Sequence, residues 1–579
     1  METPRIGVYV CWCGTNIALM VDVEAVTRQI ERLPDVVIAR NYKYMCSDPG
    51  QEMIIADIRE HQLDRIVVAA CSPRMHELTF RKALSNAGLN QYMFQMANIR
   101  EQVSWVHTDR EKATQKAISL IAGAVNRIKW HEHLDYRSVK INDATLVIGG
   151  GIAGMSAALE IANAGKQVYL MEKSDRLGGM LNNVDQLYPT MESAAQLIGS
   201  MVDRINEHPN IRIFLDRYPE QIFGYVGNFE TTLEANGTPA ATLRFGNIIV
   251  ATGLRPFDPT PITEYGYGVL PDVITSVEME KHLLTGSIRT RGGRIPRHIA
   301  LIHCVGSRND RYHPYCSRMC CMTALKQSRQ IREALPDSMV YELYADMRAI
   351  GNGCEEFYSR EFRENHMFIM FDQQKGLPLV RESDPLDKVK MVVEVREIMS
   401  GENLEIPADL VVLMVGLEAQ DDAKKVSHLV GVSLCGNEFF IEKHPKLDPV
   451  ATTTGGVFVA GNCQSPKDIP DSVSQARAAA ARVLSTICAG SVEVEVTTAE
   501  AIEAICCGCQ TCIKVCPYGA ISFDEEKRVS VVNEILCKGC GTCGSACPTG
   551  AIKSRHFTDQ QILAQIKGIM SIPAELYEI

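Results

Sequence analysis

A glycine-rich turn between two apolar segments constrains this chain more than any other feature of its sequence. Residues 145–154 read TLVIGGGIAG, in which apolar residues predict a buried parallel strand and Gly149, Gly151 and Gly154 form GxGxxG. An apolar helical pattern follows, and a second predicted strand ends on Glu172, 18 residues after Gly154. Together these parts predict a dinucleotide-binding βαβ unit, and the alternative is a plain βαβ turn.

Each of these residues has a physical role in such a unit. Gly149 permits the tight turn, and Gly154 lets the helix and the strand pack closely. Gly151 has no Cβ, so a pyrophosphate can approach the backbone and the helix N-terminus. Glu172 is placed to accept hydrogen bonds from a ribose.

Two later segments indicate which dinucleotide this unit binds. GNIIVATGLRP and GGVFVAGNC are buried strands that end in small turns, and a Gly-Gly pair closely follows Glu172. This order resembles the two-dinucleotide-fold flavoproteins, the family of thioredoxin and glutathione reductases. The resemblance implies that the first fold holds FAD and that the late turn contacts the ribityl chain, with Asn462 where that family usually has Asp. The candidate FAD-binding residues are Gly149, Gly151, Gly154, Glu172, Gly178, Gly179, Ala251, Thr252, Gly253, Gly461, Asn462 and Gln475.

Composition limits the class of protein. The chain has 579 residues, enough for three or four domains, and its net charge of −11 argues against nucleic acid and against a polybasic membrane surface. The longest apolar runs have strand length, far below the ~18 residues that span a bilayer, and no secretory signal is visible, so we expect a cytoplasmic protein without a transmembrane segment. Its 21 cysteines, an odd number, favour metal ligation in a reducing compartment over disulfides.

The C-terminal part carries the most specific motif, a cysteine pattern that occurs twice. CxxCxxCxxxCP occupies residues 506–517 and again residues 537–548. This is the bacterial two-cluster ferredoxin pattern, in which the fourth cysteine of each repeat ligates the other cluster. The first [4Fe–4S] cluster is therefore predicted on Cys506, Cys509, Cys512 and Cys547, and the second on Cys537, Cys540, Cys543 and Cys516.

Another cysteine group interrupts the expected second dinucleotide fold. Residues 299–307 predict a buried strand followed by a helix, and a pyridine-nucleotide site would place GxGxxG or GxGxxA between them. The turn contains Cys304, Cys316, Cys320 and Cys321 instead. An adjacent cysteine pair is a poor choice for packing alone, so we predict a ligated iron–sulfur cluster, with zinc as the rival metal.

Residues 1–140 predict a separate α/β domain with a further cysteine group. RIGVYVC, VVIARNYKYMC and RIVVAAC each predict a short parallel strand that leads into cysteine. The carboxyl ends of parallel strands meet at one edge of a sheet, so four thiols would gather there. The candidate ligands of a [4Fe–4S] cluster are Cys11, Cys13, Cys46 and Cys71. Their spacing matches no standard motif, and the alternative is a set of buried core cysteines.

These segments predict an α/β chain with an N-terminal α/β domain, a flavoprotein core of the thioredoxin-reductase type and a two-cluster ferredoxin domain. The tail has apolar residues at helical spacing, which favours a helix packed on its own protein over a partner-binding helix. The predicted parts are the N-terminal domain 1–140, the first FAD segment 141–257, the second dinucleotide-like fold 258–448, the closing FAD segment 449–490, the ferredoxin domain 499–555 and the C-terminal helix 556–579.

Several longer motifs resemble the A subunit of heterodisulfide reductase and its relatives. They include CWCGTNI, MCSDPGQ, VVAACSPRMHE, YCSRMCCMTALKQ and AGNCQSPKDIPDSVSQA, and the likeness extends over about residues 5–550. The resemblance implies an FAD and iron–sulfur electron-transfer subunit, electron-bifurcating or confurcating, within a larger complex. It carries over the four ligands of the Cys304 to Cys321 turn, and it places Lys326 near the flavin as a catalytic residue. The alternative for Lys326 is a surface lysine on a helix.

The resemblance also implies partners and leaves the host complex open. The implied partners are the other subunits of such a complex and a donor or acceptor such as hydrogenase, formate dehydrogenase or ferredoxin, with the chain as a homodimer. A hairpin at residues 229–245 leaves no room for the ferredoxin-like insertion of the longer methanogen-type subunits, and PTMESAAQ lacks their cysteine. Without that insertion, this chain also resembles the related subunits of class II benzoyl-coenzyme A reductase and of quinone-interacting sulfate-reduction complexes.

Two other functions are alternatives. A self-sufficient NAD(P)H-dependent disulfide reductase needs a redox cysteine pair after the Gly-Gly, where this chain has Met180, Leu181 and Asn182. It also needs the nucleotide-binding turn that cysteines have replaced. A passive ferredoxin-like carrier with a relic flavin is opposed by the complete FAD motifs.

Overall fold

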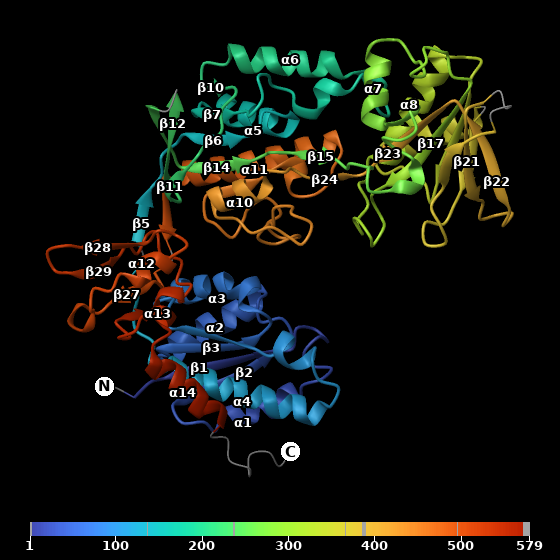
Figure 1. Cartoon of the computed structure of the whole chain (residues 1–579). Coiled ribbons are helices and arrows are strands. Elements are labelled where there is room, and N and C mark those ends of the chain that lie inside the picture. The colour runs from blue at the N-terminus through green and yellow to red at the C-terminus, as the bar shows by residue number, and fades with distance from the viewer. Residues whose placement is uncertain are drawn as a thin grey trace. The chain divides into compact units, whose positions relative to one another are not determined.

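The computed structural model describes residues 3–135, 137–235, 238–364, 366–384, 389–494 and 496–570. The chain forms two compact units (Figure 1). One unit combines residues 1–138 with residues 493–579, and the other comprises residues 139–492.

The N-terminal part of the first unit is built on a four-stranded parallel sheet, as predicted. Its strand order is β2-β1-β3-β4. Separate apolar clusters pack on its two faces, because alternate residues of the buried strands point to opposite sides. The strands are β1 (Ile6–Cys11), β2 (Val36–Tyr42), β3 (Arg65–Ala70) and β4 (Phe94–Asn98), and the helices are α1 (Val23–Ile30), α2 (Asp48–Glu60), α3 (Pro73–Ala87) and α4 (Arg110–Ile128).

The C-terminal part of the first unit is a small cysteine-rich fold with two antiparallel strand pairs, β27 with β30 and β28 with β29. Its apolar core includes Cys512 and Cys543 themselves. Each lies in a one-turn helix at the same place in its repeat. The elements are β27 (Ala499–Ala501), α12 (Thr511–Val515), β28 (Ile521–Asp524), β29 (Val529–Val532), α13 (Thr542–Ala546) and β30 (Ile552–Ser554).

The tail forms α14 (Asp559–Met570), which packs against α4 (Figure 1). A Cβ on Gly568 would lie 2.8 Å from the Cα of Gly123, so the two helices approach most closely through glycine. Arg127 Nη1 of α4 donates to Gln565 Oε1 at 2.9 Å. The helix therefore packs on its own chain through small and polar residues and through Ile569, whose Cγ1 would lie 2.7 Å from a Cβ on Gly123. The other three apolar residues expected to bury there are exposed, namely Ile562, Leu563 and Ile566.

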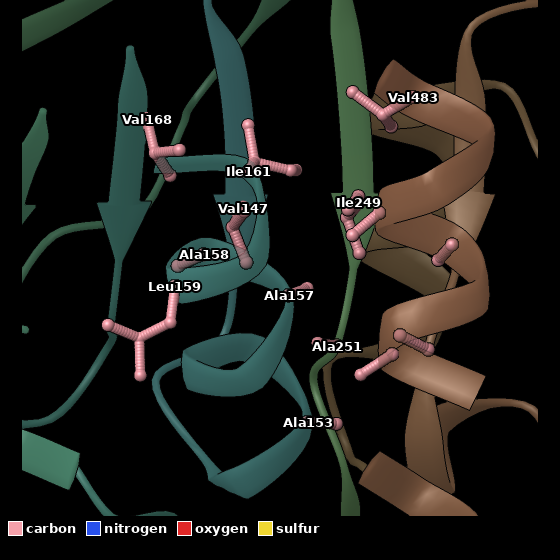
Figure 2. Close-up of a cluster of buried hydrophobic side chains, with 14 of the residues drawn as sticks. Val147, Ala153, Ala157, Ala158, Leu159, Ile161, Val168, Ile249, Ala251 and Val483 are labelled. Atoms are coloured by element: carbon pink, nitrogen blue, oxygen red, sulfur yellow. The ribbon is translucent and has the colours of Figure 1, made fainter. Parts of the chain in front are cut away.

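The second unit contains the first of two parallel five-stranded sheets, with strand order β10-β7-β6-β14-β25. Figure 2 shows the core in which α5 (Ile152–Asn163) and α11 (Ile469–Ala489) pack together beside this sheet, with Ala157 of α5 and Val483 of α11 among the buried residues. The strands are β6 (Thr145–Ile148), β7 (Val168–Met171), β10 (Ile211–Phe214), β14 (Asn247–Val250) and β25 (Val457–Val459).

A hairpin precedes β14, as predicted. It consists of β12 (Asn228–Ala235) and β13 (Thr238–Phe245), which pair antiparallel. The turn expected at Asn236 and Gly237 lies outside the described residues.

The second parallel sheet has strand order β16-β23-β17-β18-β19. Two such sheets in one unit give the two-dinucleotide-fold architecture that the sequence predicts. No helix in the described part of the chain is both long and apolar enough to cross a membrane. The elements are β16 (Val273–Thr275), α7 (Ser276–Leu284), β17 (His298–Val305), α8 (Cys320–Ala334), β18 (Met339–Tyr344), β19 (His366–Met370) and β23 (Leu410–Val415).

Candidate functional site

A cavity of about 680 Å³ opens beyond the carboxyl ends of β6 and β14 in the second unit. Open parallel sheets bind ligands at this edge. Nine of the twelve candidate FAD residues line the cavity, and so does Lys326. The nine are Gly149, Gly151, Glu172, Gly178, Gly179, Ala251, Thr252, Gly253 and Asn462.

The three glycines of GxGxxG differ in the space that a side chain would meet at each position. A Cβ on Gly154 would lie 1.8 Å from the carbonyl oxygen of Gly149, so any side chain there would separate the helix from the turn. Gly149 has φ +112°, and a Cβ on it would lie 2.3 Å from the carbonyl oxygen of Ala251. A Cβ on Gly151 would meet no atom within 4 Å. The empty space beside Gly151 is where the sequence places a pyrophosphate.

Glu172 is held at the cavity wall by its own turn. Its Oε2 accepts a hydrogen bond from Gly150 N at 2.6 Å, and its Oε1 accepts bonds from Ser174 N at 2.9 Å and Ser174 Oγ at 2.7 Å. These bonds fix the side chain, and Oε2, which accepts a single bond, has further capacity to accept. A ribose hydroxyl can therefore be bound there.

The remaining three candidates shape the wall without lining it. Gly154 closes the first turn, as described. Gly461 N donates to Gln475 Oε1 at 2.8 Å, and a Cβ on Gly461 would lie 2.6 Å from the Cβ of Ala153. Gln475 thus clamps the Gly461 turn from α11.

Three hydroxyl groups on the cavity wall have no hydrogen-bond partner within the described residues: those of Thr252, Tyr218 and Ser472. Ser472 is only 1% exposed. Buried polar groups are normally paired, so these hydroxyls indicate a polar ligand in the cavity. Sequence reasoning missed both: Tyr218 stands at no motif position, and Ser472 lies within AGNCQSPKDIPDSVSQA, but that motif does not single it out.

The cysteine turn of the second sheet adjoins the same cavity. Cys304 lies near the carboxyl end of β17, and Cys320 and Cys321 are the first residues of α8. All three are buried. Cys320 is also a wall residue of the cavity. Hydrogen bonding from Cys320 outweighs burial and lowers the pKa of Cys321 to about 4. Thiolates of this kind are the ligands that iron–sulfur clusters require.

Cys316 is partly exposed and stands somewhat apart, with its sulfur accepting from Arg318 N at 3.3 Å. Four thiolates around one zinc ion, each at about 2.3 Å, would lie close together. Within the described residues, no three cysteine sulfurs lie within 4.8 Å of one another. Hydrogen bonds nonetheless join Cys320 to Cys304 and to Cys321, so the iron–sulfur cluster stays a prediction here, with zinc as its rival.

His303 and Glu342 form a buried polar pair beside this turn. Both are 0% exposed, and His303 Nε2 lies 3.2 Å from Glu342 Oε2. Burial lowers the pKa of His303, but hydrogen bonding to Cys321 and Glu342 outweighs it and raises the pKa to about 10. The imidazolium therefore faces a thiolate, which is the electrostatic environment that stabilises a ligated sulfur.

In the ferredoxin part, two small cavities separate the eight cysteines into the predicted sets. One is lined by Cys516 of the first repeat together with Cys537, Cys540 and Cys543 of the second. The other is lined by Cys547 of the second repeat together with Cys506, Cys509 and Cys512 of the first. Each repeat thus lends its fourth cysteine to the other cavity. Cys507, which is not among the predicted ligands, also borders the second of these cavities.

The four N-terminal cysteines gather at one edge of the first sheet. Cys11 ends β1, Cys71 directly follows β3, and Cys46 lies four residues beyond β2 because a turn intervenes. Cys11 Sγ accepts hydrogen bonds from Cys13 N at 3.3 Å and Met45 N at 3.4 Å. Arg100 Nη1 donates to Cys13 Sγ at 3.4 Å. Burial outweighs these donors and raises the pKa of Cys11, Cys46 and Cys71, so the cluster at this edge stays a prediction.

Family comparisons account for both motif-bearing regions. Residues 143–289 match the family described as pyridine nucleotide-disulphide oxidoreductase. Residues 505–551 match the 4Fe-4S dicluster domain. The chain therefore carries flavin as FAD together with a 4Fe-4S dicluster in its C-terminal domain.

Whole-chain relatives decide the family. The second iron–sulfur A subunit of CoB–CoM heterodisulfide reductase from Methanopyrus kandleri is 40% identical over 99% of this chain and 100% of its own length. The A subunit of the H2:CoB–CoM heterodisulfide, ferredoxin reductase from Methanothermobacter marburgensis is 39% identical over 99% of this chain and 98% of its own. This chain belongs to the heterodisulfide reductase A subunit family.

As a heterodisulfide reductase A subunit, the chain is an oxidoreductase component that carries FAD and iron–sulfur clusters. Its alignment with the Methanopyrus protein covers 659 positions against 579 residues here, so at least 80 positions fall opposite gaps in this chain. The crystal structure of Lactococcus lactis thioredoxin reductase covers 60% of this chain and 99% of its own at 19% identity, with a TM-score of 0.41.

Lys326 of this heterodisulfide reductase family member is buried on α8, so the surface-lysine alternative is wrong. It is 2% exposed, and its Nζ donates to Glu280 Oε1 at 2.6 Å. Both side chains line the cavity. The sequence did not indicate Glu280 as a partner, since it lies 46 residues earlier on α7.

Proposed function

We propose that this chain distributes electrons between FAD and [4Fe–4S] clusters within a heterodisulfide-reductase-like complex in the cytoplasm. Bound FAD exchanges electrons in pairs or singly, whereas each cluster carries one electron. The observation that carries the proposal is the position of Cys320, which belongs to the cysteine turn and also lines the FAD cavity. A cluster ligated there would lie directly beside the flavin.

The chain's own residues divide into three roles in this proposal. The glycine turns and Glu172 hold the FAD, with Gly461 and Gln475 supporting the late turn. Sixteen cysteines hold four clusters: the two of the ferredoxin domain, one on Cys304, Cys316, Cys320 and Cys321, and one on Cys11, Cys13, Cys46 and Cys71. Lys326, buried in the cavity wall, contacts the flavin ring.

The names of relatives supply the candidates for substrate and partners. These related proteins belong to reductases of CoB–CoM heterodisulfide that are named with hydrogen, formate or ferredoxin as the other reactants. We infer that this chain works with other subunits of that kind, as a homodimer, and that its flavin bifurcates or confurcates electrons. The class II benzoyl-coenzyme A reductase and sulfate-reduction complexes are alternative hosts.

Two features of the cavity oppose a self-sufficient NAD(P)H-dependent disulfide reductase. Met180, Leu181 and Asn182 line it after the Gly-Gly, where such an enzyme needs a redox cysteine pair. The turn after β17 presents thiols where a nicotinamide cofactor's phosphates would bind. Rapid flavin reduction by NADH or NADPH in the isolated chain would contradict the proposal.

Gly151→Val tests the FAD assignment. Because nothing lies within 4 Å of a Cβ at this position, valine should leave the fold intact and exclude only the pyrophosphate. Gly199→Val is the matched control, since Gly199 on α6 (Ala194–Glu207) also has free space but does not line the cavity. We expect loss of flavin absorbance in the first variant alone. Full flavin occupancy in Gly151→Val would refute the assignment.

Purification of the tagged chain from its native cells tests the complex. We expect other iron–sulfur subunits to copurify, and their identity would decide among the host complexes. Iron analysis should give about 16 atoms per chain for four clusters. About 12 iron atoms per chain would show that one of the two sites outside the ferredoxin domain holds no cluster. About 8 would show that neither does.

A further inference from the structure

Three lysines line the cavity. Lys173 is paired with Asp422 at 3.0 Å, and the charges of the other two, Lys326 and Lys467, are balanced differently. Lys326 is paired with Glu280, at 2.6 Å between Nζ and Oε1, and both side chains are buried. Glu280 Oε1 also accepts from Gln327 Nε2 at 2.5 Å, and its Oε2 accepts from Asp185 N at 3.1 Å. The Lys326–Glu280 pair thus contributes almost no net charge to the cavity.

Lys467 has no such counter-ion. Its Nζ donates to Ser465 Oγ at 2.7 Å, to Ser465 O at 3.1 Å and to Gln464 Oε1, all of which are neutral acceptors. Within the described chain, no carboxylate forms an ion pair with it. The nearest acids are engaged elsewhere: Glu442 accepts from Gln464 at 2.8 Å, and Asp471 accepts from Arg318 at 2.8 Å.

The neutral side chain of Asn462 keeps this charge uncompensated. Asn462 Oδ1 accepts the backbone N–H of Lys467 at 2.5 Å, and both residues line the cavity. An aspartate could accept the same bond with little change of shape, but it would place a carboxylate beside the lysine. The choice of amide over acid thus leaves Lys467 without an ion-pair partner in the described chain, with Asp468 as the carboxylate that lines the same wall.

The start of α11 belongs to the same wall. Residues 468–470 and Ser472 line the cavity, and a helix N-terminus carries a partial positive charge. The Asp468 side chain caps the helix by accepting from Asp471 N at 2.8 Å and offsets part of that dipole. The Ser472 hydroxyl, 1% exposed and without a partner among the described residues, is available to a ligand.

We propose that Lys467 tunes the flavin by stabilising the negative charge that the ring acquires on two-electron, one-proton reduction. The two electrons come from reduced clusters or a partner protein, the proton adds to the ring, and one negative charge is left over. An uncompensated cation favours this reduced form over the neutral oxidised form, whereas the Lys326–Glu280 pair hardly distinguishes them. The inference rests on the proposed function, and it requires the flavin ring to lie within reach of Lys467 in this cavity.

The protonation behaviour of Lys467 agrees with this assignment. Burial lowers its pKa to about 8, and the acids nearby only partly oppose that effect. A cation held in a desolvated site gains more from a new anion than an exposed cation does. The reduced flavin would supply that anion.

The test is a redox titration of FAD in the purified holoprotein of four variants. Lys467→Met removes the charge, Lys467→Arg keeps it, Asn462→Asp adds a counter-ion, and Lys446→Met is a matched exposed control. We expect Lys467→Met to weaken the preference for reduced over oxidised flavin at least tenfold, which is about 30 mV more negative for a two-electron couple. The flavin potential of Asn462→Asp should shift in the same direction. The potentials of Lys467→Arg and Lys446→Met should stay near the wild-type value.

The double variant separates this idea from general damage to the site. If Asn462→Asp acts by neutralising Lys467, it should have much less effect in the Lys467→Met background. An unchanged potential in Lys467→Met with bound FAD, or fully additive shifts, would overturn the proposal. If Lys467→Met does not retain FAD, an unchanged potential in Asn462→Asp overturns it equally. Failure of the FAD assignment itself shows separately, as full flavin occupancy in Gly151→Val.

Discussion

Two cysteine-rich regions of this molecule, each predicted to ligate iron–sulfur clusters, differ in their surroundings. In the ferredoxin domain, Cys509 and Cys540 are exposed, and the ligands come from two short local repeats. In the turn between β17 and α8, three of four cysteines are buried and a buried His303–Glu342 pair stands beside them. Cluster potentials depend on hydrogen bonds to sulfur and on solvent exposure, so the two regions should hold electrons at different energies.

The largest expected effect comes from removing one ligand in each region. Cys320→Ala and Cys540→Ala should each lose about four iron atoms per chain. Only Cys320→Ala should also lower FAD occupancy and the melting temperature of the second unit, because Cys320 lines the cavity. Iron, flavin and thermal unfolding measurements check this, with the exposed Cys488→Ala as control. An equal loss of FAD occupancy in Cys320→Ala and Cys540→Ala would contradict the predicted difference between the two regions.

Next in size is the loss of the buried pair beside the turn. His303→Leu leaves Glu342 buried without its partner, and breaking such pairs costs about 3–5 kcal/mol. The double variant His303→Leu with Glu342→Leu should recover most of this loss. Denaturant unfolding of the second unit is the measurement. In the ferredoxin domain, Lys527→Met removes an exposed pair with Glu503, and we expect no measurable change there.

A pH effect on the apoprotein follows from Lys467. Because burial lowers its pKa to about 8 from 10.5, the unfolded chain binds more protons than the folded chain between these values. Stability should therefore rise with pH between 8 and 10.5 in the wild type relative to Lys467→Met, by at most about 3 kcal/mol. Unfolding curves at about pH 8 and pH 10, the two ends of this window, check the prediction. A wild-type stability that falls with pH relative to that of Lys467→Met would have the wrong sign.

The smallest expected effect concerns the neutral pair in the cavity wall. Lys326→Met leaves the Glu280 carboxylate alone beside the flavin and should lower its potential, whereas Glu280→Gln leaves a lone cation and should raise it. Shifts of roughly 30 mV, a tenfold change for two electrons, are expected in each direction. Potentiometric titration of both holoproteins checks the signs. Shifts of the same sign would show that the pair does not act through its charge.

The sequence predicts the local motifs well, for a physical reason. A ferredoxin repeat places three ligands within seven residues, so its geometry hardly depends on distant parts of the chain. The GxGxxG turn is similar, since Gly154 packs on Gly149 only five residues away. These features are enough to indicate the fold class, the FAD cavity and the two ferredoxin sites without any knowledge of tertiary contacts.

Features that join distant segments are predicted less fully. The helical spacing of the tail predicts buried apolar residues, yet α14 packs on α4 through glycine, polar side chains and Ile569, because Gly123 of α4 allows a close approach there. The motif around Gln475 predicts a cofactor contact, yet its side chain clamps Gly461. Such outcomes depend on which surfaces meet, and helical spacing alone does not specify them.

The sequence by itself determined which residues can hold cofactors: the glycines that admit a dinucleotide, and the cysteines whose spacing suits clusters. The tertiary structure alone decided the charges around them. Lys326 is neutralised by Glu280, 46 residues away on another helix, while Lys467 faces only neutral acceptors because Asn462 carries no charge. The Lys326–Glu280 pair depends on a distance of a few ångströms between residues far apart in the chain, and only folding sets that distance.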